Sequence, residues 1–108
     1  MRNRWLELPV VPAAMKSVWH LFPVLVASDH RASFVRHLLE CKVATGMHYP
    51  RLIPEQRALL RYGSFQIATE LTKTTRFAQS EVSLPIHPFL TDEEVEHVIA
   101  SANSWSPD

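Results

Sequence analysis

Residues 81–95 read EVSLPIHPFLTDEEV and join two local patterns that decide the fold. Residues 81–86 alternate between apolar and polar side chains, which is typical of a β-strand. The apolar members of this alternation are Val82, Leu84 and Ile86. Thr91 is followed three residues later by Glu94, which is the spacing of a capping box. The stretch therefore predicts a strand that leads directly into the first turn of a helix.

The helix after Thr91 is the most strongly marked element of the chain. Acidic residues at 92–94 place negative charge at the positive end of the helix dipole. One apolar stripe follows the helix, formed by Val95, Val98, Ile99 and Ala102. Residues 103–108 are predicted to leave the helix, with Trp105 able to fold back onto the domain.

Upstream, a strand and a helix are predicted in succession. Residues 17–27 are rich in β-branched and aromatic side chains and predict a strand, in which Pro23 favours an edge position or a bulge. Ser28 or Asp29 is a good N-cap for a helix that runs to about Cys41. The apolar face of that helix is formed by Phe34, Val35, Leu38 and Leu39.

The middle of the chain is predicted to contain a strand and two less regular helices. Residues 43–49 predict a short strand that ends at Pro50. Residues 54–62 predict a turn of helix, which Gly63 could terminate. Residues 66–80 have apolar side chains at roughly helical spacing, although four threonines weaken this prediction.

The predicted class is α+β, with a small, mostly antiparallel three-stranded sheet packed with helices. The element order is β-α-β-(α)-α-β-α, and strands and helices packed in layers are the economical architecture for it. Residues 1–16 are expected to form an extended lead-in that looks like a chain entered midway. Residues 17–105 form the domain, and residues 106–108 form a frayed tail.

Composition restricts the class of protein. The chain has 108 residues, a length that fits one compact domain. Eleven basic and eleven acidic residues give a formal net charge of zero, which argues against a nucleic-acid-binding protein. Residues 21–27 form the longest apolar stretch, which is too short to span a bilayer, and the N-terminus lacks the apolar core of a signal peptide.

Cysteine usage points to the compartment. Cys41 is the only cysteine, so neither an intramolecular disulfide nor a multi-cysteine zinc site can form. A reducing, cytoplasmic environment is expected. Cys41 is interpreted as a half-buried thiol at a helix end rather than as a nucleophile.

Five stretches of the chain, in order, resemble one known family. They are residues 8–12 (LPVVP), 18–22 (VWHLF), 31–39, 46–50 (GMHYP) and 77–95. Together they resemble the C-terminal small domain of the DegT/DnrJ/EryC1/StrS sugar-nucleotide aminotransferases, which take part in amino sugar biosynthesis. The resemblance extends from about residue 6 to residue 105.

The resemblance implies a substrate-binding role for three residues. In the family, the small domain closes over the active site, and a large N-terminal domain holds pyridoxal phosphate (PLP) through a lysine Schiff base. By this resemblance His48 and Tyr49 lie near the nucleotide-sugar, and Gln56 matches a glutamine in the following loop. The chain departs from the family at Pro54, where a histidine is frequent, and at Arg57, where a proline is frequent.

The machinery for amino transfer is not recognisable in this chain. None of the three lysines, Lys16, Lys42 and Lys73, has the small-residue context of a Schiff-base lysine. The two glycines, Gly46 and Gly63, do not form a phosphate-binding loop. We therefore predict no catalytic residue and no PLP in this chain, and no transaminase activity of the chain alone.

The histidines and tryptophans are further candidates for a site. His20, His87 and His97 could bind zinc, but they lie on separate elements, so no metal site is predicted. His20 is interpreted as a buried strand residue and His97 as an exposed or flanking residue of the last helix. The three tryptophans are interpreted as packing residues.

Three functional hypotheses follow. The first is a C-terminal fragment, or a separately encoded small domain, of a sugar-nucleotide aminotransferase. The second is a non-catalytic interaction module that associates with an aminotransferase subunit or with itself through an exposed apolar face. The third is a gene remnant. The first two predict a missing PLP-binding domain or subunit as the partner, and neither involves nucleic acid or a membrane.

Overall fold

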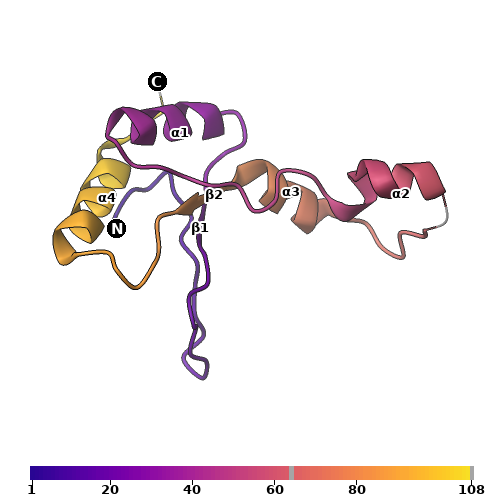
Figure 1. Ribbon diagram of the computed structural model, residues 1–108, viewed down its shortest axis with the longest axis horizontal. Helices are drawn as coiled ribbons and strands as arrows, with labels where there is room; N and C mark the ends of the chain where they lie inside the picture. Colours follow the sequence, from indigo (N-terminus) through magenta and orange to yellow (C-terminus); the bar gives the residue numbers. More distant parts are fainter. Residues whose placement is uncertain (64, 108) are drawn as a thin grey trace.

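The computed structural model describes residues 1–63 and 65–107. Within these residues the chain forms an α+β domain of two strands, four α-helices and one short 3₁₀ helix, shown in Figure 1. In chain order these are β1 (Phe22–Leu25), α1 (Arg31–Glu40), η1 (Ile53–Glu55), α2 (Arg57–Tyr62), α3 (Thr72–Ser80), β2 (Glu81–Leu84) and α4 (Asp92–Ser104). The predicted α+β class is confirmed.

The sheet consists of β1 and β2 in antiparallel pairing, with Val24 opposite Val82. A single residue pairs with each outer edge: Glu7 with Leu25 of β1, and Gly46 with Ser83 of β2. Both edge pairings are antiparallel and carry two backbone hydrogen bonds each, of 2.8–3.0 Å. Four chain segments thus lie side by side, although two of them contribute one residue each.

The prediction of a three-stranded sheet was wrong, because residues 43–49 form no strand. Gly46 alone pairs with β2. Lys42 takes a left-handed conformation, with φ of 64°, just before this segment. Beyond Gly46, the backbone N–H of His48 donates to the side chain of Glu81 rather than to a strand carbonyl. The segment therefore leaves the sheet after one pairing.

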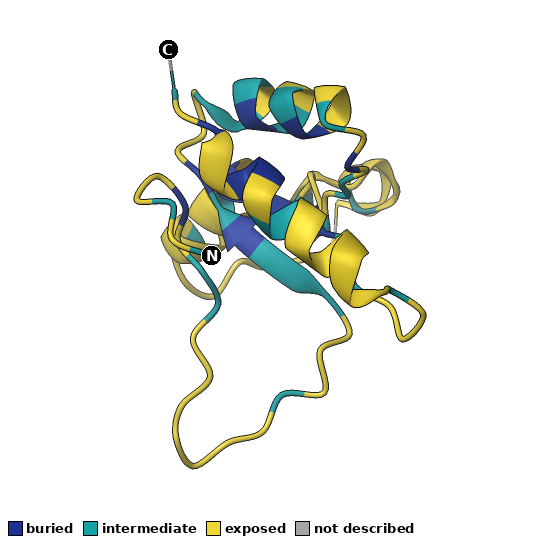
Figure 2. Ribbon diagram, turned by 90° about the vertical axis from the view of Figure 1, so that its left-hand side faces the viewer, coloured by how far each residue is buried: buried dark blue, intermediate teal, exposed yellow. Residues whose placement is uncertain are grey.

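The first strand is shorter than predicted, since residues 17–21 do not pair. Residues 9–21 instead project as the exposed loop seen in Figure 2, and Val18 within it is 93% exposed. His20 lies in this loop and is exposed, so its interpretation as a buried strand residue was wrong.

Pro23 is tolerated in β1 because of its position in the ladder. The N–H of Leu25 points away from β2, toward Glu7. Backbone groups two residues apart point to the same side of a strand, so Pro23 lacks a donor only on this outer side. The predicted edge position of Pro23 is confirmed.

Helix ends follow the sequence signals only in part. The N-cap of α1 is His30, not Ser28 or Asp29, because a turn closed by His30 N and Ala27 O comes before the helix. Helix α3 begins at Thr72 rather than near residue 66. Gly63 ends α2 in a left-handed conformation, with φ of 60°, as predicted.

The core lies between the sheet, α1 and α4. Figure 2 shows that the sides of α1 and α4 that face each other are buried, whereas their outer sides are exposed. Phe34 and Trp105 are in contact there, with ring centroids 5.0 Å apart. Trp105 is only 4% exposed, so the predicted return of this side chain onto the domain is confirmed. The core cluster comprises Leu6, Val24, Val26, Phe34, Leu38, Val43, Val82, Leu84, Ala102 and Trp105.

The capping box of α4 is present. The Thr91 hydroxyl oxygen accepts from the Glu94 backbone N–H at 3.2 Å, and the Glu94 carboxylate accepts from the Thr91 backbone N–H at 2.8 Å. The Thr91 hydroxyl also donates to this carboxylate. These bonds favour the ionised form, the backbone bond most strongly, and they lower the pKa of Glu94 from its ordinary value of 4.5.

This lowered pKa predicts a pH-dependent contribution to stability. Because the folded-state pKa of Glu94 is below its unfolded value, its contribution is complete above pH 4.5 and is lost as pH falls through the folded-state pKa. Glu94→Gln should therefore lower the free energy of unfolding at neutral pH, and its difference from the wild type should shrink below pH 4.5. Urea titrations at neutral pH and below pH 4.5 measure this difference between Glu94→Gln and the wild type. Glu96→Gln, at an exposed glutamate of the same helix, is the control.

Candidate functional site

The three residues predicted to bind substrate lie on the connection between α1 and α2. In Figure 1 this connection leaves the sheet beside β2 and runs past α3 toward α2. His48 is half-buried, whereas Tyr49 is 74% exposed and Gln56 is exposed. The rings of His48 and Tyr49 meet edge to face, with centroids 5.5 Å apart. The Gln56 amide donates to the Arg51 carbonyl at 3.3 Å. The structure thus brings His48 and Tyr49 together, and Gln56 turns to the loop after them.

His48 is held by two polar side chains of β2. Its backbone N–H donates to Glu81 Oε2 at 2.8 Å, and its Nδ1 lies 2.9 Å from Ser83 Oγ. The Ser83 hydroxyl donates in turn to Glu81 Oε1. Glu81 is 2% exposed and Ser83 is 5% exposed, so this network is buried. A buried network whose polar groups are satisfied restricts the side chains that it joins.

Sequence reasoning missed Glu81 and Ser83 as site residues. Their alternation with Val82 and Leu84 predicts a strand but not its burial, and all four residues of β2 are buried. Val82 and Leu84 belong to the core on one face, and His48 contacts Glu81 and Ser83 on the other. The signal that could have identified these two residues is a glutamate, Glu81, that begins a strand whose next positions include the apolar Val82 and Leu84.

Gly46 gives His48 the space to reach Ser83. A Cβ at residue 46 would lie 2.6 Å from Cε1 and 3.3 Å from Nδ1 of the His48 ring. A contact of 2.6 Å does not occur between such atoms, so any side chain at this position displaces the ring. Gly46 is therefore part of the site geometry, because the His48 ring occupies the space that a side chain at residue 46 would need.

Gly46→Ala should break the bond between His48 and Ser83. We expect the ring resonances of His48 to shift and the free energy of unfolding to fall by about 1 kcal/mol, the usual contribution of one hydrogen bond. Two-dimensional NMR and urea titration measure these effects. Gly63→Ala is the control, because a Cβ there has no neighbour within 4 Å but its φ of 60° is strained. It should also cost about 1 kcal/mol but leave His48 unchanged. Unshifted His48 resonances in Gly46→Ala would contradict this role.

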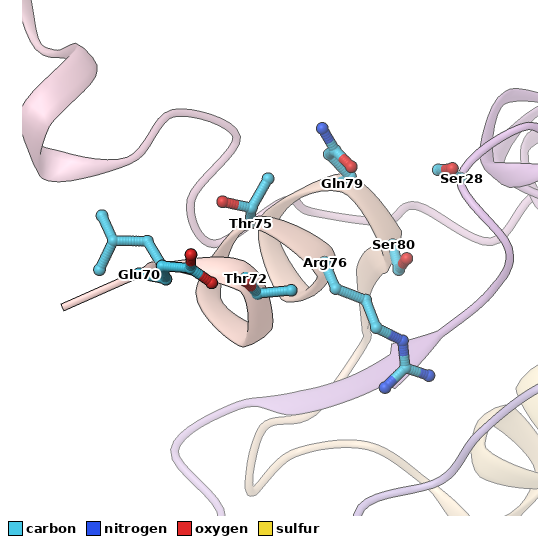
Figure 3. Close-up of a pocket in the computed structure, with 8 residues that line it drawn as sticks. Ser28, Glu70, Thr72, Thr75, Arg76, Gln79 and Ser80 are labelled. Carbon is cyan, nitrogen blue, oxygen red and sulfur yellow. The ribbon is translucent and has the colours of Figure 1, made fainter.

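Other hollows lie away from His48. A groove of about 590 Å³, lined mainly by residues of polar type, follows α3. Figure 3 shows Thr72, Thr75, Arg76 and Gln79 of α3 along this groove, and Ser28 lines it from a separate segment near the C-terminal end of the helix. The charge of Arg76 is paired with Glu7. An apolar pocket of about 390 Å³ lies beneath α4 and is lined by Val95, Val98 and Ile99 of the predicted stripe. None of the three predicted site residues lines either hollow.

The other candidate sites are separate. His97 Nε2 lies 2.7 Å from the Cys41 carbonyl oxygen, and His87 Nδ1 accepts from the Phe89 N–H at 3.2 Å. Across residues 1–63 and 65–107, no three His, Cys, Asp or Glu side chains are grouped to hold a metal ion. Cys41 is partly buried at the end of α1, as predicted. In the same part of the chain, no helix has the length and apolar character needed to cross a membrane.

Comparison with protein families identifies the chain. The family model described as the DegT/DnrJ/EryC1/StrS aminotransferase family matches residues 3–103. The chain therefore belongs to this family, and the expected family membership is confirmed. Its members use PLP or its amino form, PMP.

Individual relatives agree with this assignment. The chain is 34% identical to the dTDP-3-amino-3,6-dideoxy-alpha-D-galactopyranose transaminase of Aneurinibacillus thermoaerophilus, over 97% of this chain and 27% of that protein. Among solved structures, it matches DesV of S. venezuelae in complex with a ketimine intermediate, with a TM-score of 0.80, 30% identity, and coverage of 93% and 26%. It also matches NtdA of Bacillus subtilis with bound cofactor PMP, with a TM-score of 0.76, 30% identity, and coverage of 92% and 22%.

The chain spans about a quarter of the length of the curated relatives that it matches. Its own residues do not fit the family cofactor. Lys16, Lys42 and Lys73 are all exposed and lie on three separate segments, whereas a Schiff-base lysine requires desolvation or a charge partner that lowers its pKa.

Proposed function

We propose that this chain is the C-terminal fragment, or a separately encoded small domain, of a PLP-dependent sugar-nucleotide aminotransferase. The observation that carries the proposal is the match of nearly the whole chain to about a quarter of each enzyme. In this proposal PLP is bound by a large domain on other residues. The single, half-buried Cys41 is consistent with a reducing cytoplasm.

The role proposed for this chain is to orient a nucleotide-linked keto-sugar. His48 is held by Glu81 and Ser83, so its ring is presented in one orientation. Tyr49 presents an exposed ring beside it. Correct orientation of a bound substrate can lower a reaction barrier by about 7 kcal/mol in favourable cases, without any proton transfer by the orienting residues. Gln56 is proposed as a further substrate contact.

Complementation tests this proposal. The chain is co-expressed with the A. thermoaerophilus transaminase from which the matched segment has been deleted, and amino transfer to a nucleotide-linked keto-sugar is measured. We expect activity only when both polypeptides are present, and none from the chain alone. Tyr49→Ala should lower kcat/KM about tenfold, the effect of losing about 1.4 kcal/mol of interaction. Tyr62→Ala, at a tyrosine of α2 that is 79% exposed, is the matched control. Equal activity of the two variants would contradict the role of Tyr49.

A second candidate function is a non-catalytic module that associates with an aminotransferase subunit. Residues 9–21, 50–63 and 65–71 project from the domain and carry apolar side chains that are largely exposed, Val10, Val18, Ile53 and Tyr62 among them. The radius of gyration is 16.1 Å, whereas a compact chain of this length would have about 13 Å. Exposed apolar surface of this kind marks an interface. Size-exclusion chromatography with a hydrophobic dye tests it, and a monomer that binds no dye would count against it.

The DNA upstream of Met1 separates a fragment from an independent module. A reading frame for a PLP domain next to this one, with its Schiff-base lysine, would support the first proposal. A sequence without such a frame would favour the interaction module or a gene remnant.

A further inference from the structure

We propose that Glu81 and Ser83 are positioning residues that hold His48 as its Nδ1–H tautomer, so that Nε2 is a hydrogen-bond acceptor for a sugar hydroxyl. The inference deepens the proposed function and rests on it for the identity of the ligand. The assignment of the tautomer depends only on the chain itself.

Each oxygen of the Glu81 carboxylate has a hydrogen-bond donor. A carboxylate can only accept hydrogen bonds. Its two oxygens lie against the backbone N–H of His48, at 2.8 Å, and the hydroxyl of Ser83. Both partners can donate, so the carboxylate is satisfied without a proton of its own. The one hydroxyl hydrogen of Ser83 is therefore directed to Glu81.

The Ser83 hydroxyl determines which nitrogen of His48 carries the hydrogen. A serine hydroxyl has a single hydrogen, and here Glu81 accepts it. Ser83 Oγ is then only an acceptor toward the His48 Nδ1, which lies 2.9 Å away. The hydrogen between them must belong to Nδ1. In a neutral imidazole the other nitrogen, Nε2, then carries a lone pair and no hydrogen.

The Nε2 atom of His48 is available to a ligand. It makes no hydrogen bond within the described residues, and no buried side-chain nitrogen or oxygen among them lacks a partner. Nε2 therefore reaches the surface, next to the exposed ring of Tyr49. A lone pair accepts from a hydroxyl and is repelled by a phosphate oxygen. His48 thus selects for the sugar part of a nucleotide-sugar rather than for its diphosphate.

The backbone holds this arrangement in place. Gly46 and Ser83 exchange two backbone hydrogen bonds, of 2.8 and 3.0 Å, two residues before His48. This pairing sets the distance between the His48 ring and Ser83, and the missing Cβ of Gly46 leaves room for the ring. The ring orientation and the tautomer are therefore set before any ligand binds.

The test is the ¹⁵N spectrum of the histidine rings in the full chain at pH 8, where imidazoles with an ordinary pKa of about 6.5 are neutral. His48→Gln identifies the His48 signals. We expect Nδ1 of wild-type His48 at the protonated position and Nε2 at the unprotonated position. Ser83→Ala should shift the population toward Nε2–H. Glu81→Gln should do the same, because its amide can donate to Ser83. Ser101→Ala, at a buried serine of α4, is the matched control and should leave the His48 tautomer unchanged.

A wild-type His48 that is mainly Nε2–H, or a tautomer that is the same in Ser83→Ala and the wild type, would overturn the proposal. Adding dTDP-glucose should shift Nε2 toward the hydrogen-bonded position, whereas inorganic phosphate should not. Equal responses to the two probes would overturn the acceptor role. No response to either, with the Nδ1–H tautomer present, would contradict the proposed function and leave the positioning role of Glu81 and Ser83 supported.

Discussion

Phe34→Ala is expected to lower the free energy of unfolding by about 3–5 kcal/mol. Phe34 has no exposed surface and lies in the core between α1, the sheet and Trp105. Its removal loses the transfer energy of a large side chain and leaves a cavity that the ring of Trp105 only partly fills. Domains of this size are typically stable by about 5–15 kcal/mol, so the loss is a large fraction of the total. Urea titration measures it through the fluorescence of the buried Trp105.

Phe89→Ala is the matched control for the core. Phe89 is 86% exposed, so the same truncation there should change stability by less than about 0.5 kcal/mol. Phe34→Leu keeps an apolar side chain at the buried position and remains measurable if Phe34→Ala fails to fold. Similar losses for Phe34→Ala and Phe89→Ala would show that the core is not centred on Phe34.

Glu81→Ala is expected to cost about 3 kcal/mol, an unusually large effect for a glutamate. The carboxylate accepts from the His48 backbone N–H and from the Ser83 hydroxyl, and it is 2% exposed. Alanine leaves both donors in a buried site without an acceptor, and each hydrogen bond to a charged group contributes about 1.5–3 kcal/mol. Urea titration measures the loss, and the amide signal of His48 should move to that of a weaker hydrogen bond.

Glu96→Ala and Glu81→Gln bracket this prediction. Glu96 is exposed on α4, so its replacement by alanine should change stability by less than about 0.5 kcal/mol. Glutamine at residue 81 keeps one acceptor oxygen but turns an amide group toward the other donor, so its loss should lie between those of the other two variants. A loss below about 1 kcal/mol for Glu81→Ala would mean that water replaces the carboxylate.

Two elements with signals inside one turn were predictable from the sequence, the capping box of Thr91 and Glu94 and the glycine end of α2. The predicted N-cap of α1 at Ser28 or Asp29 was wrong, since the helix is capped at His30. Strand lengths were not predictable in the same way. Residues 17–21 have a composition typical of strands, yet they do not pair with β2 and project as an exposed loop. Residues 43–49 likewise make one pairing and then depart.

The sequence by itself determined the family, the α+β class and the helix that begins at Asp92, because these depend on local patterns and on the order of motifs. Only the tertiary structure decided which side chains hold His48. Glu81 and Ser83 are 33 and 35 residues away from it along the chain, and the pairing of Gly46 with Ser83 brings them together. Local propensity carries no information about that register. The register arises because burial on both faces of β2 selects a single alignment of the segments.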